Sequence, residues 1–193
     1  MKLNLPNKLT LIRFILAPVF MIVLMIDFPF HYLVSLVVFA LASITDYFDG
    51  KIAREQGLVT DFGKFLDPIA DKMITTAAFL GFTFLKIGYG IVWVAFIVLL
   101  REFVVMSVRL AAVDNGKVVA ANMWGKSKTV MQMVAICVTL FLCFIDEAVS
   151  LSATVAFVFE IVCSALLWIS AILTFIAGIT YIVENKDYIN SNR

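Results

Sequence analysis

Long apolar stretches alternate with short polar stretches along the whole chain. The apolar stretches cover residues 9–26, 33–53, 69–85, 91–113, 130–145 and 153–183. A helix needs about 20 apolar residues to cross the roughly 30 Å hydrocarbon core of a bilayer. The pattern therefore predicts an all-α membrane protein in which six transmembrane helices form a single domain over residues 1–193.

The first and last apolar stretches allow more than one interpretation. Residues 5–13 mix basic and apolar side chains, which is typical of a short N-terminal amphipathic segment that enters the membrane from its surface, and equally of a plain helix start. No small-residue cleavage site follows, so we expect the first apolar stretch to be retained as a helix. Residues 153–183 exceed the length of one crossing, so the part around Glu160 lies at the interface or the helix tilts strongly.

Composition and charge support a membrane protein. Hydrophobic residues make up 63% of the chain and charged residues 15%, whereas roughly 45–50% of a soluble domain is apolar. The formal net charge of +1 gives no reason to expect a nucleic-acid partner. Basic residues gather at 51–64 and 117–128, in alternate connections, and the positive-inside rule then places these connections and both termini in the cytosol. We expect a multi-pass protein of the cell membrane (inner or plasma membrane), surrounded by membrane lipids.

Four aspartates lie where the second apolar stretch ends and the third begins. Asp46 and Asp49 are three residues apart, and Asp67 and Asp71 are four apart, so each pair shares one face of a helix. Two helices joined by a short connection can direct all four carboxylates into one cleft. Carboxylates so close together repel one another unless cations neutralise them, and an all-oxygen ligand set favours Mg²⁺ or Mn²⁺. The cluster therefore predicts two divalent ions that clamp a pyrophosphate.

Individual aspartates have simpler interpretations. Asp67 before Pro68 is also typical of a helix start, with the aspartate as N-cap and the proline in the first turn. Asp46 and Asp49 alone would fit solvated loop charges. The whole pattern over residues 46–71, D-x2-D-G-x2-A-R-x8-G-x3-D-x3-D, holds eight positions at set spacing. Eight matching residues at these spacings are very improbable in an unrelated sequence.

This pattern resembles the signature of the CDP-alcohol phosphotransferases without departure, and the six-helix layout extends the resemblance over nearly the whole chain. The resemblance implies the fold of that family, a homodimer, and a role for Asp71 as general base. It implies that two metal ions are held by Asp46, Asp49, Asp67 and Asp71. The CDP moiety is expected at Gly50, Ala53, Arg54 and Thr60. Small residues there let a substrate approach the backbone, and an arginine supplies charge for phosphate.

Further cations indicate the kind of alcohol. Arg101 and Glu102 lie midway along the fourth apolar stretch, and Arg109 follows two turns later. Charges at that depth face a watery cavity or each other. Neighbours in sequence point to different sides of a helix, so we expect no ion pair between Arg101 and Glu102, and at least one arginine in the active-site cavity. Lys126 and Lys128 precede the fifth stretch and either bind a phosphate or anchor the helix at lipid headgroups. Together these cations predict an anionic acceptor.

The segment 101–103, Arg109 and the segment 125–132 look like the phosphatidylglycerophosphate synthase branch of that family. This resemblance implies transfer of the phosphatidyl group of CDP-diacylglycerol to sn-glycerol 3-phosphate, giving phosphatidylglycerol phosphate and CMP at a site that faces the cytosol. It implies that the acceptor phosphate contacts Arg101, Arg109, Lys126 and Lys128.

Two other hypotheses stay open. A sibling transferase would use another acceptor, such as serine or inositol phosphate. A cation transporter would line a permeation path with its acids, and it predicts carboxylates spread through the depth of several helices rather than gathered at the ends of two.

Overall fold

The described residues form six helices and no strand. The computed structural model describes residues 5–56, 61–114 and 123–186, with side-chain environments at 7–45, 69–110, 112 and 123–186. The helices are α1 (Leu5–Met25), α2 (His31–Gln56), α3 (Asp61–Leu85), α4 (Ile91–Asp114), α5 (Met123–Val149) and α6 (Ala153–Glu184). Within this part of the chain, α1, α4, α5 and α6 are long and apolar enough to cross a membrane. The prediction of an all-α membrane protein is confirmed.

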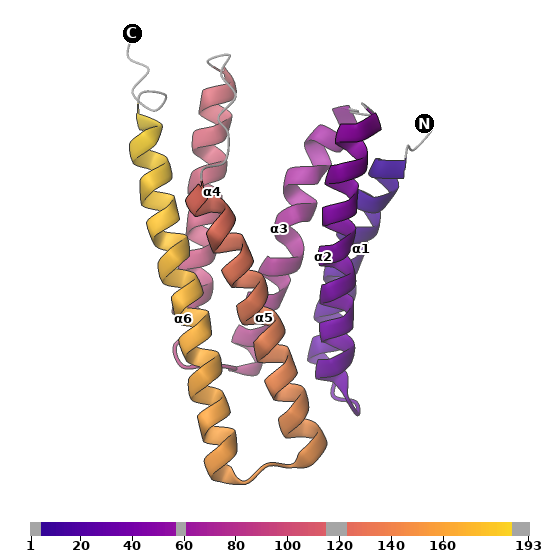
Figure 1. Ribbon diagram of the computed structural model, residues 1–193, viewed down its shortest axis with the longest axis vertical. Coiled ribbons are helices and arrows are strands. Elements are labelled where there is room, and N and C mark those ends of the chain that lie inside the picture. Colours follow the sequence, from indigo (N-terminus) through magenta and orange to yellow (C-terminus); the bar gives the residue numbers. More distant parts are fainter. Residues whose placement is uncertain (1–4, 57–60, 115–122, 187–193) are drawn as a thin grey trace.

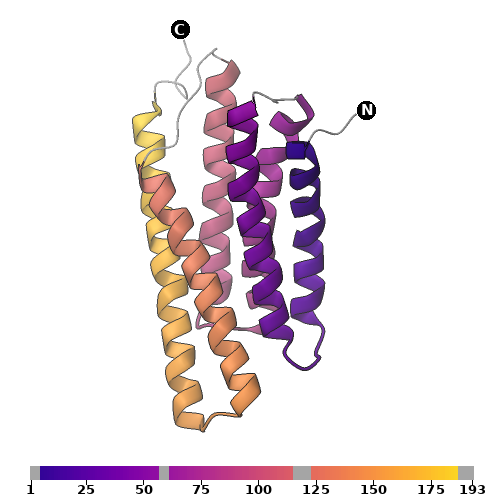
Figure 2. The same ribbon diagram turned by 45° about the vertical axis from the view of Figure 1, so that its right-hand side comes forward.

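Consecutive helices run in opposite directions (Figure 1). The N-terminal end of α1 and the C-terminal end of α6 lie at the same end of the bundle, which we call the N/C end (Figures 1 and 2). The end of α2, the start of α3 and the end of α4 also lie there, whereas α5 starts farther down the bundle, in the half nearer that end. The connections at 26–30, 86–90 and 150–152 lie at the opposite end. Because helices joined by short connections run antiparallel, the residues that precede and follow 57–60 meet at the N/C end.

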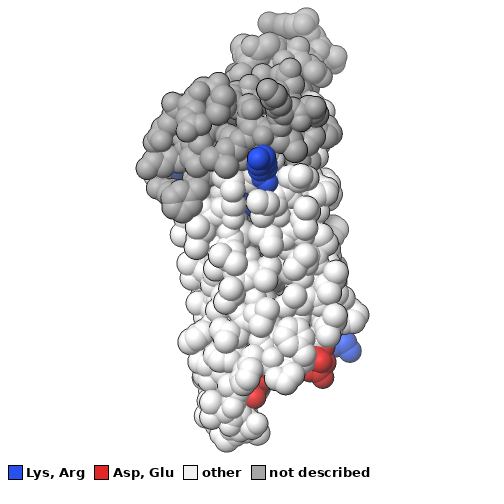
Figure 3. All heavy atoms as spheres, turned by 90° about the vertical axis from the view of Figure 1, so that its right-hand side faces the viewer, with Lys and Arg blue, Asp and Glu red and all other residues white. Residues whose placement is uncertain are grey.

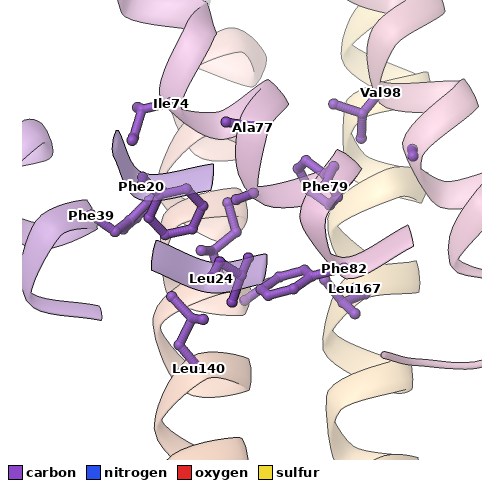
Figure 4. Close-up of a cluster of buried hydrophobic side chains, with 14 of the residues drawn as sticks. Phe20, Leu24, Phe39, Ile74, Ala77, Phe79, Phe82, Val98, Leu140 and Leu167 are labelled. Atoms are coloured by element: carbon purple, nitrogen blue, oxygen red, sulfur yellow. The ribbon is translucent and has the colours of Figure 1, made fainter. Parts of the chain in front are cut away.

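The bundle has one main core to which all six helices contribute. Helix α1 packs against α2 and α3, α4 packs against α3 and α6, and α5 packs against α2 and α6. Figure 4 shows the central side chains, which include Phe20, Leu24, Phe39, Phe79, Phe82, Val98, Leu140 and Leu167. The rings of Phe20 and Phe39 lie with their centroids 5.9 Å apart. Since lipid tails are as apolar as these side chains, close packing rather than exclusion from water holds such helices together.

The outer surface of the bundle is apolar between its two ends, as expected of a protein that spans a bilayer. On the face shown in Figure 3, the described charged residues lie near the two ends and the surface between them is uncharged. Large apolar side chains point outward along the helices, including Val92, Trp93 and Phe96 of α4. A surface of this kind is unfavourable in water and favourable against hydrocarbon.

Several helices extend beyond the predicted apolar stretches. Helix α3 begins at residue 61 instead of 69, and α5 begins at residue 123 instead of 130. Pro68 therefore lies inside α3, and the alternative that Asp67 caps a helix start is wrong. Helix α1 is continuous from Leu5, so residues 5–13 begin the first helix rather than form a separate segment. The apolar pattern marks only the part of a helix in contact with core or lipid, and polar turns continue the helix past it.

Candidate functional site

The four aspartates lie on two helices at the N/C end. Asp46 and Asp49 lie in the last three turns of α2, and Asp67 and Asp71 lie in the first three turns of α3. Most of the expected CDP and metal residues lie outside the described side chains: Asp46, Asp49, Gly50, Ala53, Arg54 and Asp67, together with the whole of Thr60. Their roles stay predictions.

Asp71 is the one predicted metal ligand whose side chain is described. Its Oδ2 lies 2.5 Å from the Nζ of Lys72, and both side chains are more than one-third exposed. Among the described side chains, no group of three or more His, Cys, Asp or Glu could hold a metal ion. The chemistry of the expected donor set is four carboxylates, the hard oxygen ligands that Mg²⁺ and Mn²⁺ prefer. The donor set fits these ions.

A cavity of about 1280 Å³ brings Asp71 together with the predicted acceptor-site cations. Helices α1, α3, α4 and α5 line it, and α6 contributes one residue. The cations in its lining are Lys72, Arg101, Arg109, Lys126 and Lys128. Asp71 and Glu102 are the carboxylates of the described lining, so its formal charge is +3. A cavity with this charge and low-dielectric walls attracts an anion.

The rest of the cavity is apolar. Pro18 and Met21 of α1, Leu80 of α3, and Leu99 and Phe103 of α4 line it. The volume exceeds the roughly 300–1,000 Å³ of ordinary small-molecule pockets. The cavity therefore combines charged side chains near Asp71 with a larger number of apolar side chains.

An ion cluster lies in the charged part, centred on Glu102. Its Oε1 accepts a hydrogen bond from the Nζ of Lys128 and one from the Nη1 of Arg101, the latter at 3.3 Å. Its Oε2 lies 4.0 Å from the Nζ of Lys72. The side chain of Lys128 is 3% exposed and that of Arg101 is 9% exposed. Cations buried so deeply need an anion beside them, and Glu102 supplies it.

The prediction that Arg101 and Glu102 do not pair is wrong. The two side chains leave α4 in different directions, but both are long, and Lys128 holds the carboxylate where the guanidinium can reach it. Gly178 of α6 leaves room for the Arg101 stem, because a Cβ on this glycine would lie 2.8 Å from the Arg101 Cγ. The neighbouring helices thus decide the pairing.

A buried hydrogen-bond chain joins α5 to α6 beside this cluster. The Nε2 of Gln132 donates to the Oγ1 of Thr174 at 3.0 Å, and that hydroxyl donates to the carbonyl of Ser170 at 2.6 Å. Gln132 lies one turn after Lys128 on α5. These hydrogen bonds therefore fix the rotation of α5 about its axis, and with it the direction of Lys128 toward the cavity.

Tyr181 is a cavity residue that the sequence did not reveal. It lies on α6, is 2% exposed, and packs against Val105 and Val108 of α4. Its hydroxyl and the Nε of Arg101 are buried without a hydrogen-bond partner in the described part of the chain. A tyrosine near the end of an apolar stretch is common at membrane interfaces, so its position in the sequence carried no signal.

Comparison with known proteins identifies similar sequences. Residues 3–176 match the model of the CDP-alcohol phosphatidyltransferase family. The chain is 36% identical to the CDP-diacylglycerol–glycerol-3-phosphate 3-phosphatidyltransferase of Bacillus subtilis, over 98% of each chain. It is 36% identical to the protein of that name from Rickettsia bellii, over 96% of this chain and 97% of the relative. It is also 38% identical to a probable phosphatidylglycerophosphate synthase of Mycobacterium tuberculosis, over 94% of this chain and 81% of the relative.

Proposed function

The chain belongs to the CDP-alcohol phosphatidyltransferase family, and on this basis we propose that it transfers the phosphatidyl group of CDP-diacylglycerol to sn-glycerol 3-phosphate. The products are phosphatidylglycerol phosphate and CMP. The names of the Bacillus and Rickettsia relatives support this donor and acceptor. The observation that carries the proposal is the cavity that joins Asp71, a described lining of formal charge +3 and apolar side chains of α1, α3 and α4.

The proposed arrangement places the whole chain in the membrane. All six helices cross the bilayer as one domain with the fold of this family, and two copies form a homodimer. The N/C end, where α2 and α4 end, faces the cytosol, because the positive-inside rule places the basic residues of 51–64 and 117–128 there. The CDP moiety binds near Gly50, Ala53, Arg54 and Thr60, and the apolar part of the cavity takes an acyl chain of the donor.

The charged part of the cavity suits the proposed acceptor. A phosphate monoester carries about −1.5 to −2 charges near pH 7. Arg101, Arg109, Lys126 and Lys128 line the cavity and provide donors for charge-assisted hydrogen bonds. Serine carries a carboxylate and an ammonium group but no phosphate, so it could not form the charge-assisted hydrogen bonds that a phosphate forms with these cations.

Asp71 is the proposed general base. Asp46, Asp49, Asp67 and Asp71 would hold two divalent ions, which supply charge neutralisation to the pyrophosphate and to the attacking and leaving oxygens. The acceptor hydroxyl attacks the phosphorus that bears the diacylglycerol, and its proton passes to Asp71. A new oxygen–phosphorus bond forms as the bond to the bridging pyrophosphate oxygen breaks, and CMP leaves with that electron pair.

Release of CMP by the purified protein in detergent tests the proposal. CDP-diacylglycerol and Mg²⁺ or Mn²⁺ are supplied with and without glycerol 3-phosphate. We expect release that depends on both the metal and glycerol 3-phosphate. Release only with serine or inositol phosphate would identify a sibling transferase. Metal flux into sealed vesicles without CMP release would identify a transporter.

A further inference from the structure

Five charged side chains of the cavity form a chain of alternating charge across three helices. Asp71 and Lys72 of α3 are paired at 2.5 Å, and Lys72 faces Glu102 of α4 at 4.0 Å. Glu102 in turn binds Lys128 of α5 and Arg101 of its own helix. This row of charges begins at Asp71, the proposed base, and ends at two buried cations, Lys128 and Arg101. Glu102 is the carboxylate between them.

The burial of these groups shows what Glu102 does for Lys128. The Lys128 side chain is 3% exposed and that of Glu102 is 16% exposed. An ammonium group without a counter-ion at such a position is unfavourable, and a lysine released from its partner turns toward water. Without Glu102, Lys128 and Arg101 would also repel each other. Glu102 therefore determines where both cations lie.

We propose that Glu102 is a positioning residue that holds the phosphate-binding cations at a set distance from Asp71. This inference rests on the proposed function. The acceptor presents a hydroxyl at one end and a phosphate at the other, so the distance from base to cations must match its length. The two oxygens of Glu102 contact different cations: Oε1 binds Lys128 and Arg101, and Oε2 faces Lys72, which is paired with Asp71. Glu102 thereby contributes to selection of a short phosphorylated alcohol.

Positioning and simple charge attraction predict opposite results for Glu102→Gln. Removal of the carboxylate raises the formal charge of the described lining from +3 to +4, so charge attraction alone predicts tighter binding of an anion. Positioning predicts weaker binding, because Lys128 and Arg101 lose the group that orders them. The sign of the change therefore separates the two explanations.

The experiment measures the dissociation constant of glycerol 3-phosphate by calorimetry, in detergent with Mg²⁺, for the wild type, Glu102→Gln, Lys128→Met and the double variant. We expect each single substitution to raise the dissociation constant about 10-fold. Because the amide oxygen of a glutamine can still accept a hydrogen bond from Arg101, Glu102→Gln should act mainly through Lys128, and the double variant should bind within about threefold of Lys128→Met. The Michaelis constant for CDP-diacylglycerol should stay within about twofold of the wild type in each active variant.

Glu160→Gln is the matched control. Glu160 accepts a hydrogen bond from the Tyr89 hydroxyl at 3.3 Å. Tyr89 belongs to the connection at the end of the bundle opposite Asp71, so this variant should bind and turn over like the wild type. If Glu102→Gln alone fails to fold, Lys128→Met and the double variant still provide the comparison, since removal of both partners leaves no unpaired charge between them.

Three results would overturn the inference: tighter or unchanged binding in Glu102→Gln, fully multiplicative effects in the double variant, or no binding of glycerol 3-phosphate by the wild type. The proposed reaction has a separate criterion. Wild-type protein that binds glycerol 3-phosphate with the expected coupling, yet releases no CMP, would refute the reaction and leave the positioning role intact.

Discussion

Gly178→Ala is a small change that should disturb acceptor binding through Arg101. The added Cβ would lie 2.8 Å from the Arg101 Cγ, 3.8 Å from its Cβ and 4.0 Å from its Cδ. Carbon atoms in good contact are about 3.5–4.0 Å apart, so the arginine stem must move by about 1 Å. The Nη1 of Arg101 already lies 3.3 Å from the Oε1 of Glu102. A shift of that size is enough to break this hydrogen bond.

The magnitudes favour a binding defect over unfolding. Overpacking a core costs about 1–3 kcal/mol, and alanine recovers about 1 kcal/mol of helix propensity relative to glycine. The net loss of stability is therefore about 0–2 kcal/mol. Loss of one hydrogen bond to a charged group is worth about 1.5 kcal/mol, which corresponds to an increase of about 10-fold in the Michaelis constant for glycerol 3-phosphate.

Gly81→Ala provides a control with a comparable clash and no charged partner. A Cβ on Gly81 would lie 2.5 Å from the Cδ2 of Leu24, inside the apolar contact between α3 and α1. Both variants are measured for melting temperature in detergent and for the Michaelis constants of donor and acceptor. We expect Gly81→Ala to lower the melting temperature without changing either constant. Gly178→Ala should raise the constant for glycerol 3-phosphate alone.

The reasoning fails if Gly178→Ala leaves the Michaelis constant for glycerol 3-phosphate unchanged. It also fails if both glycine variants raise that constant equally, since the effect would then reflect general loosening of the bundle.

Three further predictions concern the proposed chemistry. Asp71→Asn should lower the rate of CMP release by at least about 10²-fold, because both the base and a metal ligand are weakened; near-normal turnover would exclude Asp71 as the base. Arg109→Ala and Lys126→Ala should each raise the Michaelis constant for glycerol 3-phosphate more than that for CDP-diacylglycerol, and unchanged values in both would remove these cations from the acceptor site. Chelation of divalent metals with EDTA should abolish CMP release, and Mg²⁺ or Mn²⁺ should restore it; activity that survives chelation would contradict the metal site.

The fold followed from local features of the sequence to a large extent. The six apolar stretches correspond to α1–α6 because each stretch is long enough to be a helix. The bounds were less accurate where polar turns continue a helix beyond its apolar part, as at Asp61 of α3 and Met123 of α5. Family membership followed from the aspartate pattern, because its spacing is a property of the sequence alone.

The candidate site was predictable only in part. Asp71, Arg101 and Lys128 were singled out because charges in or beside apolar stretches are costly and therefore conspicuous. Tyr181 and Gly178 were missed because neither residue type stands out near the end of an apolar helix. Their places in the site depend on how α6 packs against α4, which no local pattern records.

Local features of the sequence were enough to predict the helical membrane fold and the family, and they carry the prediction for the aspartates, because each depends on the length, composition or spacing of nearby residues. Packing between the helices sets which charged side chains come into contact. Glu102 and Lys128 are 26 positions apart and come together because α4 and α5 line the same cavity. Arg101 joins Glu102, its neighbour in sequence, because Gly178 of another helix leaves space for its side chain. An ion pair depends on distance and burial, and in this protein packing between helices sets both.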